Sequence, residues 1–187
     1  MREKNLLKRK MAESEDNFDC ALEKALQCLS NFMMSRELRT EQTKVIRTLV
    51  SQGDLLAVLP TGFGKSLIFQ VLVRVKEILT GKTSIVIVVC LSKSIVQDQI
   101  AEASSMGLTA VSLADNRLED IENAKYQLVF ASAEEVLSNS FLLSLKKIDT
   151  PLHQQLCAII VDESHTVETW TGRRLDFNLN NSNISLC

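Results

Sequence analysis

The run Leu59–Ser66, which reads LPTGFGKS, constrains the possible fold of this chain more than any other segment. It lies between the apolar stretch Leu55–Leu59, typical of a buried parallel strand, and a run with helical periodicity. Glycines at such a junction let successive backbone N–H groups turn inward around phosphate oxygens, and the helix start adds a partial positive charge. We therefore predict a phosphate-binding loop that contacts a nucleotide through Thr61, Gly62, Phe63, Gly64, Lys65 and Ser66.

Two side chains of this loop have the chemistry that a triphosphate with its magnesium ion requires. Lys65 can reach the β- and γ-phosphates, and the Ser66 hydroxyl can ligate Mg²⁺. The common pattern has a glycine where this chain has Leu59, so the loop is a variant with one glycine fewer. The alternative interpretation is a glycine turn before a helix with a chance Lys-Ser pair.

A second segment, Ala158–Glu163, has the pattern of a buried strand that ends in two carboxylates. In a nucleotide site, Asp162 would hold Mg²⁺ through its water shell, and Glu163 would orient and polarise the attacking water. An apolar strand followed by Asp-Glu is common by itself, and a surface turn explains many such cases. In the same chain as a phosphate loop, however, the pair predicts an enzyme that hydrolyses nucleoside triphosphates.

Composition limits the class of protein. The 187 residues are 45% hydrophobic, enough for one domain with a buried core, and the formal net charge of −2 means that any nucleic-acid contact is local. The five cysteines show no CxxC spacing, so a zinc site is not expected. Cys90 and Cys157 lie in apolar runs, as buried thiols in a reducing compartment would.

No stretch approaches the ~20 apolar residues of a membrane span. The basic run Leu7–Lys10 is either a weak nuclear-import patch or a solvated tail.

Strand-like and helix-like runs alternate along the chain, which predicts an α/β fold with a mainly parallel sheet between helices. Residues 1–16 are predicted to form a charged flexible tail, residues 17–174 the folded lobe, and the Asn- and Ser-rich residues 175–187 an irregular end. Helices are expected to begin near Phe18 and at Thr40, which can act as a cap. Strands are expected at 55–59, 84–90, 108–113, 127–131 and 157–162, and further helices at 65–79, from 92 or 94 to 103, at 117–124 and in parts of 133–147.

The order of these motifs resembles superfamily 2 helicases and, within them, the RecQ family. The phosphate loop and Asp162–His165 (DESH) match the wider superfamily, whereas the Gln-Asp-Gln at 97–99 and Trp170 point to RecQ. The chain departs from the family pattern at Leu91 and Ala133, which replace prolines. Further matches are Leu38–Gln42 (LRTEQ), Phe69-Gln70 and Val129–Glu134 (VFASAE), and the residues after Trp170, Thr171–Arg174, replace the usual Gly-His-Asp-Phe-Arg.

The resemblance implies a RecA-like P-loop domain, incomplete at its C-terminal end, and it assigns roles to residues before the loop. Gln42 and Arg39 are expected to seat the adenine of ATP, since an amide can both donate to and accept from a purine edge. The plainer interpretation of Gln42 is a solvated helix residue.

The resemblance also implies contacts with DNA. Trp170 would stack on a base, and His165 would act as a relay beside the two carboxylates. The alternative for Trp170 is a core anchor. Ser92, Lys93 and Ser94, at a predicted helix start, are expected to bind DNA phosphates, and the alternative for them is a plain capping cluster.

Taken with the resemblance, the sequence predicts an ATP-dependent 3′-5′ DNA helicase, present as a first-lobe fragment that binds ATP and Mg²⁺. The expected partners are single-stranded or partly duplex DNA, with a second helicase lobe missing from this chain, no membrane contact, and a nuclear location. One alternative is a non-catalytic nucleotide- or DNA-binding module that competes with a full-length helicase. Another is a different P-loop ATPase or a small kinase, although no arginine-rich lid is evident.

Overall fold

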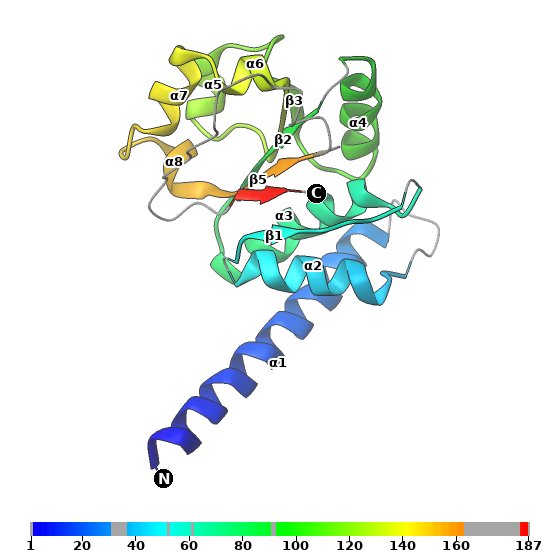
Figure 1. The fold of residues 1–187 in the computed structure, drawn as a ribbon, viewed down its shortest axis with the longest axis vertical. Coiled ribbons are helices and arrows are strands. Elements are labelled where there is room, and N and C mark those ends of the chain that lie inside the picture. The colour runs from blue at the N-terminus through cyan, green and yellow to red at the C-terminus, as the bar shows by residue number, and fades with distance from the viewer. Residues whose placement is uncertain are drawn as a thin grey trace.

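The computed structural model describes residues 2–30, 37–51, 53–60, 62–90, 93–162 and 184–186, and within them the side chains of 15–29, 37–51, 53–60, 62–90 and 95–162. A sheet lies at the centre with helices on both faces, and the long helix α1 projects away from this body (Figure 1). The predicted α/β architecture, a RecA-like arrangement with a parallel sheet between helices, is confirmed.

The sheet has the strand order β1-β6-β5-β2-β4-β3, and every neighbouring pair is parallel. In the middle, Val89 of β2 lies opposite both Ala131 of β4 and Val161 of β5, so these strands end level with one another. The carboxyl ends of parallel strands form the edge at which open α/β sheets bind ligands. The strands are β1 Leu55–Leu56, β2 Ile85–Val89, β3 Ala110–Ser112, β4 Leu128–Ala131, β5 Leu156–Val161 and β6 Ile184–Leu186.

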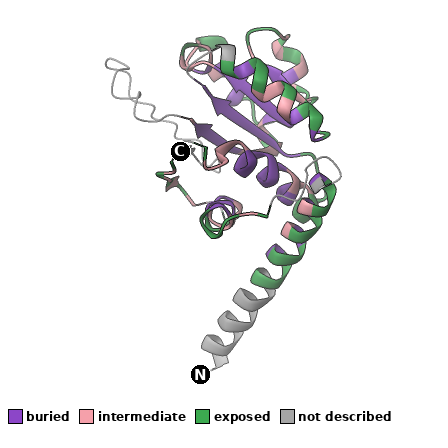
Figure 2. Ribbon diagram, turned by 90° about the vertical axis from the view of Figure 1, so that its right-hand side faces the viewer, coloured by how far each residue is buried: buried purple, intermediate pink, exposed green. Residues whose placement is uncertain are grey.

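Both faces of the central strands are buried, as Figure 2 shows in purple. Val86 and Val88 of β2 belong to one core cluster, and Ile85, Ile87 and Val89 belong to a second, because successive strand residues point to opposite faces. The first core also contains residues of helices α1 Arg2–Ser30, α2 Thr40–Val50, α3 Lys65–Thr80 and α4 Lys93–Ser105. The second contains residues of α5 Leu118–Glu122, α6 Ala133–Val136, α7 Asn139–Leu145 and α8 Pro151–Gln155.

The N-terminal helix is longer than the sequence pattern predicts. α1 begins at Arg2 and not near Phe18, so it runs through the residues predicted to form a flexible tail. Residues 1–30 contain neither glycine nor proline, and charged residues such as Lys, Arg and Glu are good helix formers. Among the described side chains of α1, the apolar face packs against the core through Phe18, Ala21, Ala25 and Leu29.

The two strands at one side of the sheet also differ from expectation. β1 has two residues and not the five of Leu55–Leu59, and Val58 is 89% exposed. Among the described residues β1 pairs with β6, and Leu56 lies opposite Leu186, the last described residue of that strand. β6 itself lies within residues 175–187, which were predicted to be irregular, and it joins the sheet between β1 and β5.

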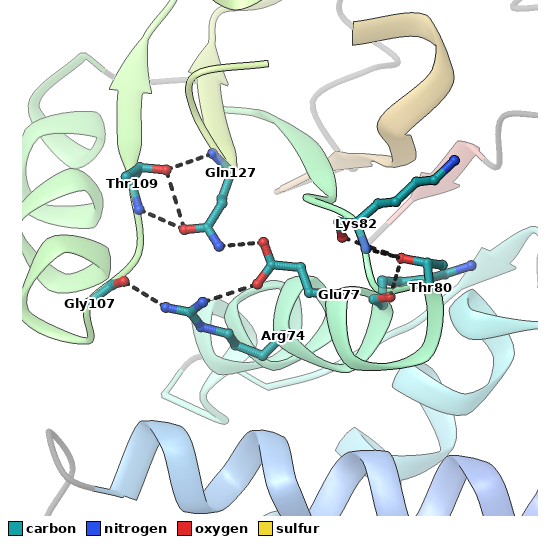
Figure 3. Close-up of polar contacts among 8 residues, drawn as sticks. Arg74, Glu77, Thr80, Lys82, Gly107, Thr109 and Gln127 are labelled. Carbon is teal, nitrogen blue, oxygen red and sulfur yellow. Dashed lines mark hydrogen bonds and ion pairs between the residues drawn. The ribbon is translucent and has the colours of Figure 1, made fainter. Parts of the chain in front are cut away.

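A polar network joins several elements at the amino ends of the strands (Figure 3). Arg74 of α3 donates to the carboxylate of Glu77 at 3.0 Å and to the Gly107 carbonyl at 2.6 Å. The Gln127 amide donates to the same carboxylate at 2.6 Å and accepts from the Thr109 backbone N–H at 2.9 Å. Thr109 precedes β3 and Gln127 precedes β4, so the network fixes the second half of α3 against the start of both strands.

Candidate nucleotide-binding site

The predicted phosphate loop connects β1 to α3. Gly62 and Gly64 have φ angles of 75° and 84°, in the left-handed region that a side chain disfavours. The Phe63 N–H donates to the Pro60 carbonyl at 3.1 Å, which closes a tight turn before α3 begins at Lys65. Thr61 lies outside the described residues. Glycines at positive φ are compatible with a loop whose amide groups turn toward a phosphate, and the phosphate contact stays a prediction.

The structure brings together the cation and one of the two carboxylates predicted for the site. Lys65 Nζ lies 3.7 Å from Asp162 Oδ1, and the two side chains are 21% and 26% exposed. Lys65 is the first residue of α3, and Asp162 follows β5, where its N–H donates to the Val89 carbonyl at 3.0 Å. Opposite charges held this close at the mouth of a loop can accept an anion on one side and a cation on the other.

Ser66, the predicted magnesium ligand, is fixed by a residue from another helix. Gln99 Nε2 of α4 donates to Ser66 Oγ at 2.9 Å. Gln99 belongs to the Gln-Asp-Gln motif, but sequence reasoning did not assign it to the site. The helical spacing of Val96, Gln99 and Ala103 places Gln99 on the stripe of α4 that faces the core, which is a signal the sequence does carry.

Gln42 lies against the phosphate loop and is almost fully buried, with 3% of its surface exposed. Its amide nitrogen donates to the carbonyls of Phe63 at 3.0 Å and Gly64 at 3.1 Å, and its oxygen accepts from the Arg39 N–H at 2.8 Å. In this conformation the amide anchors the loop. Gln42 is not a solvated helix residue, and its part in adenine recognition stays a prediction.

The same hydrogen bond changes the start of α2. The N-cap position belongs to Arg39, and the Gln42 side chain reaches back to its N–H, so Thr40 is the first helical residue and not the predicted cap. The Arg39 guanidinium lies over the Phe63 ring, with Cζ 4.4 Å from the ring centroid. This cation–π contact joins the start of α2 to the loop and holds two predicted nucleotide-binding residues side by side.

Cys90 borders the site at the end of β2. Burial, with a smaller contribution from the charge of Asp162, raises the pKa of this thiol to about 12. The thiol is therefore neutral at physiological pH, and it places no second negative charge beside Asp162. The prediction of a buried thiol is confirmed for Cys90, which is 5% exposed.

A cavity of about 210 Å³ lies beyond the carboxyl ends of β2, β3 and β4, beside the first turns of α4. Several polar residues that line it form hydrogen bonds with one another: Gln97 donates to Asp115 at 3.4 Å, and Ser132 and Glu135 form a reciprocal cap at the start of α6. α4 contributes Val96 and Gln97 to this lining and begins at Lys93, but the side chains of the predicted DNA ligands Lys93 and Ser94 are not described.

Several predicted residues lie outside the described part of the chain, so their roles stay predictions. They are Thr61, Ser92, Glu163, His165 and Trp170.

The oxygen donors of the site suit magnesium. Mg²⁺ commonly binds through one or two protein oxygens and completes its shell with water and substrate phosphates. Ser66 and Asp162 offer a hydroxyl and a carboxylate of this kind, close to Lys65. Within the described ranges there is no cluster of three or more His, Cys, Asp or Glu side chains that could hold a metal ion.

Comparison with known proteins identifies the family. The family model described as DEAD/DEAH box helicase matches residues 39–184, a span that begins at Arg39 and includes the loop and Asp162. The chain belongs to the DEAD/DEAH box helicase family. The matched range contains every predicted site residue.

Individual relatives confirm the resemblance to the RecQ type. The chain is 30% identical over 152 residues to the mouse bifunctional 3′-5′ exonuclease/ATP-dependent helicase WRN, covering 79% of this chain and 10% of that protein. It is 28% identical over 156 residues to the ATP-dependent DNA helicase RecQ of Haemophilus influenzae (78% and 23% covered) and 25% identical over 158 residues to that of Bacillus subtilis (80% and 25% covered). It thus spans a quarter or less of these three relatives. Among the helices described, none is long and apolar enough to cross a membrane.

Proposed function

We propose that this chain forms the ATP-binding lobe of a RecQ-type ATP-dependent DNA helicase with 3′-5′ polarity. The observation that carries the proposal is the approach of Lys65 to Asp162, 3.7 Å apart at the end of a loop that holds Gly62 and Gly64 at positive φ. Membership of the DEAD/DEAH box helicase family and the similarity to RecQ helicases support the same assignment.

In this proposal each residue of the site has a defined task. The loop amides and Lys65 hold the β- and γ-phosphates. When the nucleotide binds, the Lys65 ammonium therefore interacts less with Asp162 and more with the phosphates. Ser66 and Asp162 hold the magnesium ion, which neutralises charge on the phosphate oxygens. Glu163 follows Asp162 directly and would polarise the attacking water.

Adenine recognition requires a change at Gln42. Its amide nitrogen is committed to the carbonyls of Phe63 and Gly64, and its oxygen to the Arg39 N–H. A purine edge would have to replace some of these partners, or bind beside Arg39 where it stacks on Phe63. We therefore assign Gln42 two roles in sequence: it supports the loop before the nucleotide binds, and it reads the base afterwards.

The DNA-binding part of the proposal rests on the family resemblance. Ser92, Lys93 and Ser94 at the start of α4 would contact the phosphates of single-stranded or partly duplex DNA, and Trp170 would stack on a base. His165 would link this side to the carboxylates. A nuclear location belongs to the same proposal and is supported by the basic run Leu7–Lys10.

The test is ATP hydrolysis by the full chain, with and without single-stranded DNA, beside the Glu163→Gln variant. DNA-stimulated turnover that this variant loses would support a catalytic lobe. Binding of Mg-ATP without turnover would favour the second candidate, a nucleotide-binding module that competes with a complete helicase. Failure to bind Mg-ATP at all would contradict both.

A further inference from the structure

Gln99 has no task in the function proposed above, yet it touches the site. Its amide nitrogen lies 2.9 Å from Ser66 Oγ, although Gln99 belongs to α4 and Ser66 to the first turn of α3. In the described part of the chain, the Gln99 amide is the side chain that hydrogen-bonds to Ser66.

The direction of this hydrogen bond matters for metal binding. The Gln99 amide is the donor, so the Ser66 hydroxyl oxygen accepts and keeps one lone pair and its own proton for other partners. A serine that ligates magnesium must present a lone pair to the metal. The amide leaves that lone pair available and at the same time removes the rotational freedom of the hydroxyl group.

The other atom of the same amide is unsatisfied. Gln99 Oε1 is buried and has no hydrogen-bond partner among the described residues. A buried acceptor without a partner costs about 1–3 kcal/mol, and a donor that enters the site would recover part of that cost. A water molecule in the shell of a magnesium ion is a strong donor, and it would fit an acceptor this close to Ser66.

We propose that Gln99 is a positioning residue of the magnesium-nucleotide site, which holds Ser66 Oγ ready for the metal and accepts a hydrogen bond from a metal-bound water. This inference rests on the proposed function and deepens it. It gives the last residue of the Gln-Asp-Gln motif a physical role, and it means that any displacement of α4 is transmitted to a metal ligand.

The test separates binding of the metal from binding of the nucleotide. Affinity for a fluorescent, non-hydrolysable ATP analogue is measured on the full chain in EDTA and across a magnesium titration. Gln99→Met keeps the length of the side chain and removes both polar groups. It should leave the affinity in EDTA unchanged and weaken the affinity of the nucleotide complex for magnesium about tenfold or more.

Two matched variants complete the design. Gln97→Met makes the same change two residues earlier on α4, where the amide contacts Asp115, and should keep the magnesium dependence of the wild type. Gln99→Asn keeps an amide that is one methylene too short to reach Ser66, and should behave like Gln99→Met. If Gln99→Met does not fold, Gln99→Asn decides the question.

The possible failures can be told apart with Lys65→Ala. If the wild type does not bind the analogue, or if Lys65→Ala binds it equally well, the proposed function is wrong and the role of Gln99 goes with it. If Lys65→Ala loses binding but both Gln99 variants keep the magnesium dependence of the wild type, only the role of Gln99 is overturned.

Discussion

The two edges of the parallel sheet use polar residues in opposite ways. At the amino edge, Arg74, Glu77, Gln127 and Thr109 satisfy one another at 2.6–3.0 Å, with the Arg74 Nε as the buried atom left over (Figure 3). At the carboxyl edge, the Lys65–Asp162 approach is longer, at 3.7 Å.

One of the buried polar atoms without a partner lies at the carboxyl edge, where a ligand could use it. The Gln99 oxygen is buried without a partner beside Ser66, and the loop holds two glycines in the left-handed region. A closed network such as the one around Glu77 stabilises the fold and offers nothing to a ligand. Open groups reduce stability and become useful only when phosphate and metal bind. The comparison predicts that mutations at the two edges affect different measurements.

The largest expected effect is on nucleotide affinity at the carboxyl edge. Lys65→Ala removes the cation that faces the phosphates, and loss of one such partner costs about 3 kcal/mol, or about 100-fold in affinity. Equilibrium binding of Mg-ATP measures it. Lys82→Ala, which removes an exposed lysine just before β2 at the amino edge, is the control and should bind normally. Equal affinities in the two variants would contradict the assignment of the loop.

Next in size is a loss of stability at the amino edge. Glu77→Ala leaves Arg74 and the Gln127 amide without their shared acceptor, and should lower the free energy of unfolding by about 2 kcal/mol. Urea denaturation measures the change, and Mg-ATP affinity should stay at the wild-type value. Glu119→Ala, at an exposed position on α5, should change neither. A large fall in nucleotide affinity for Glu77→Ala would remove the distinction between the edges.

A smaller effect separates backbone strain from contact with Gln42. Gly64→Ala and Gly81→Ala both place a side chain at positive φ, 84° and 67°, which costs about 1–2 kcal/mol each. At Gly64 the new Cβ would also lie 2.9 Å from Gln42 Nε2, whereas nothing lies within 4 Å at Gly81. Both variants should lose similar stability, but only Gly64→Ala should weaken Mg-ATP binding. Normal binding by Gly64→Ala would contradict the role of Gln42 as the anchor of the loop.

The smallest effect concerns thiol reactivity. Because the raised pKa of Cys90, about 12, keeps its thiolate fraction low throughout the range below that pH, alkylation at pH 8 should be slow. The exposed thiols of Cys20 and Cys28 on α1 are the internal controls and should react first. Mass spectrometry of alkylated peptides measures the order. Labelling of Cys90 as fast as Cys20 in the native chain would show that the end of β2 is not closed.

Local patterns predicted the loop and the central sheet well. Glycines in the loop, a helix that begins at Lys65 and β-branched strands are properties of neighbouring residues, and the structure has all three. β6 was not predicted because a three-residue strand in an Asn- and Ser-rich segment is specified by its partners β1 and β5, which are distant in sequence.

The site was predicted in part for the same reason. Lys65, Ser66 and Asp162 follow from motifs, but the amide contacts of Gln42 and Gln99 join different helices and have no local signature of their partners. Helical periodicity could have shown that both amides face the core. Gln42 shares a stripe of α2 with Val45, Ile46 and Leu49, and that placement excludes a solvated position.

The most direct test of the central claim is amide hydrogen exchange of the full chain with and without a non-hydrolysable Mg-ATP analogue. The account predicts protection of the amides in residues 62–67 and at Asp162, with exchange at Gly107, Thr109 and Gln127 unchanged. Protection confined to the amino edge, or none at the loop under conditions where the analogue binds, would contradict the assignment of the carboxyl edge as the nucleotide site.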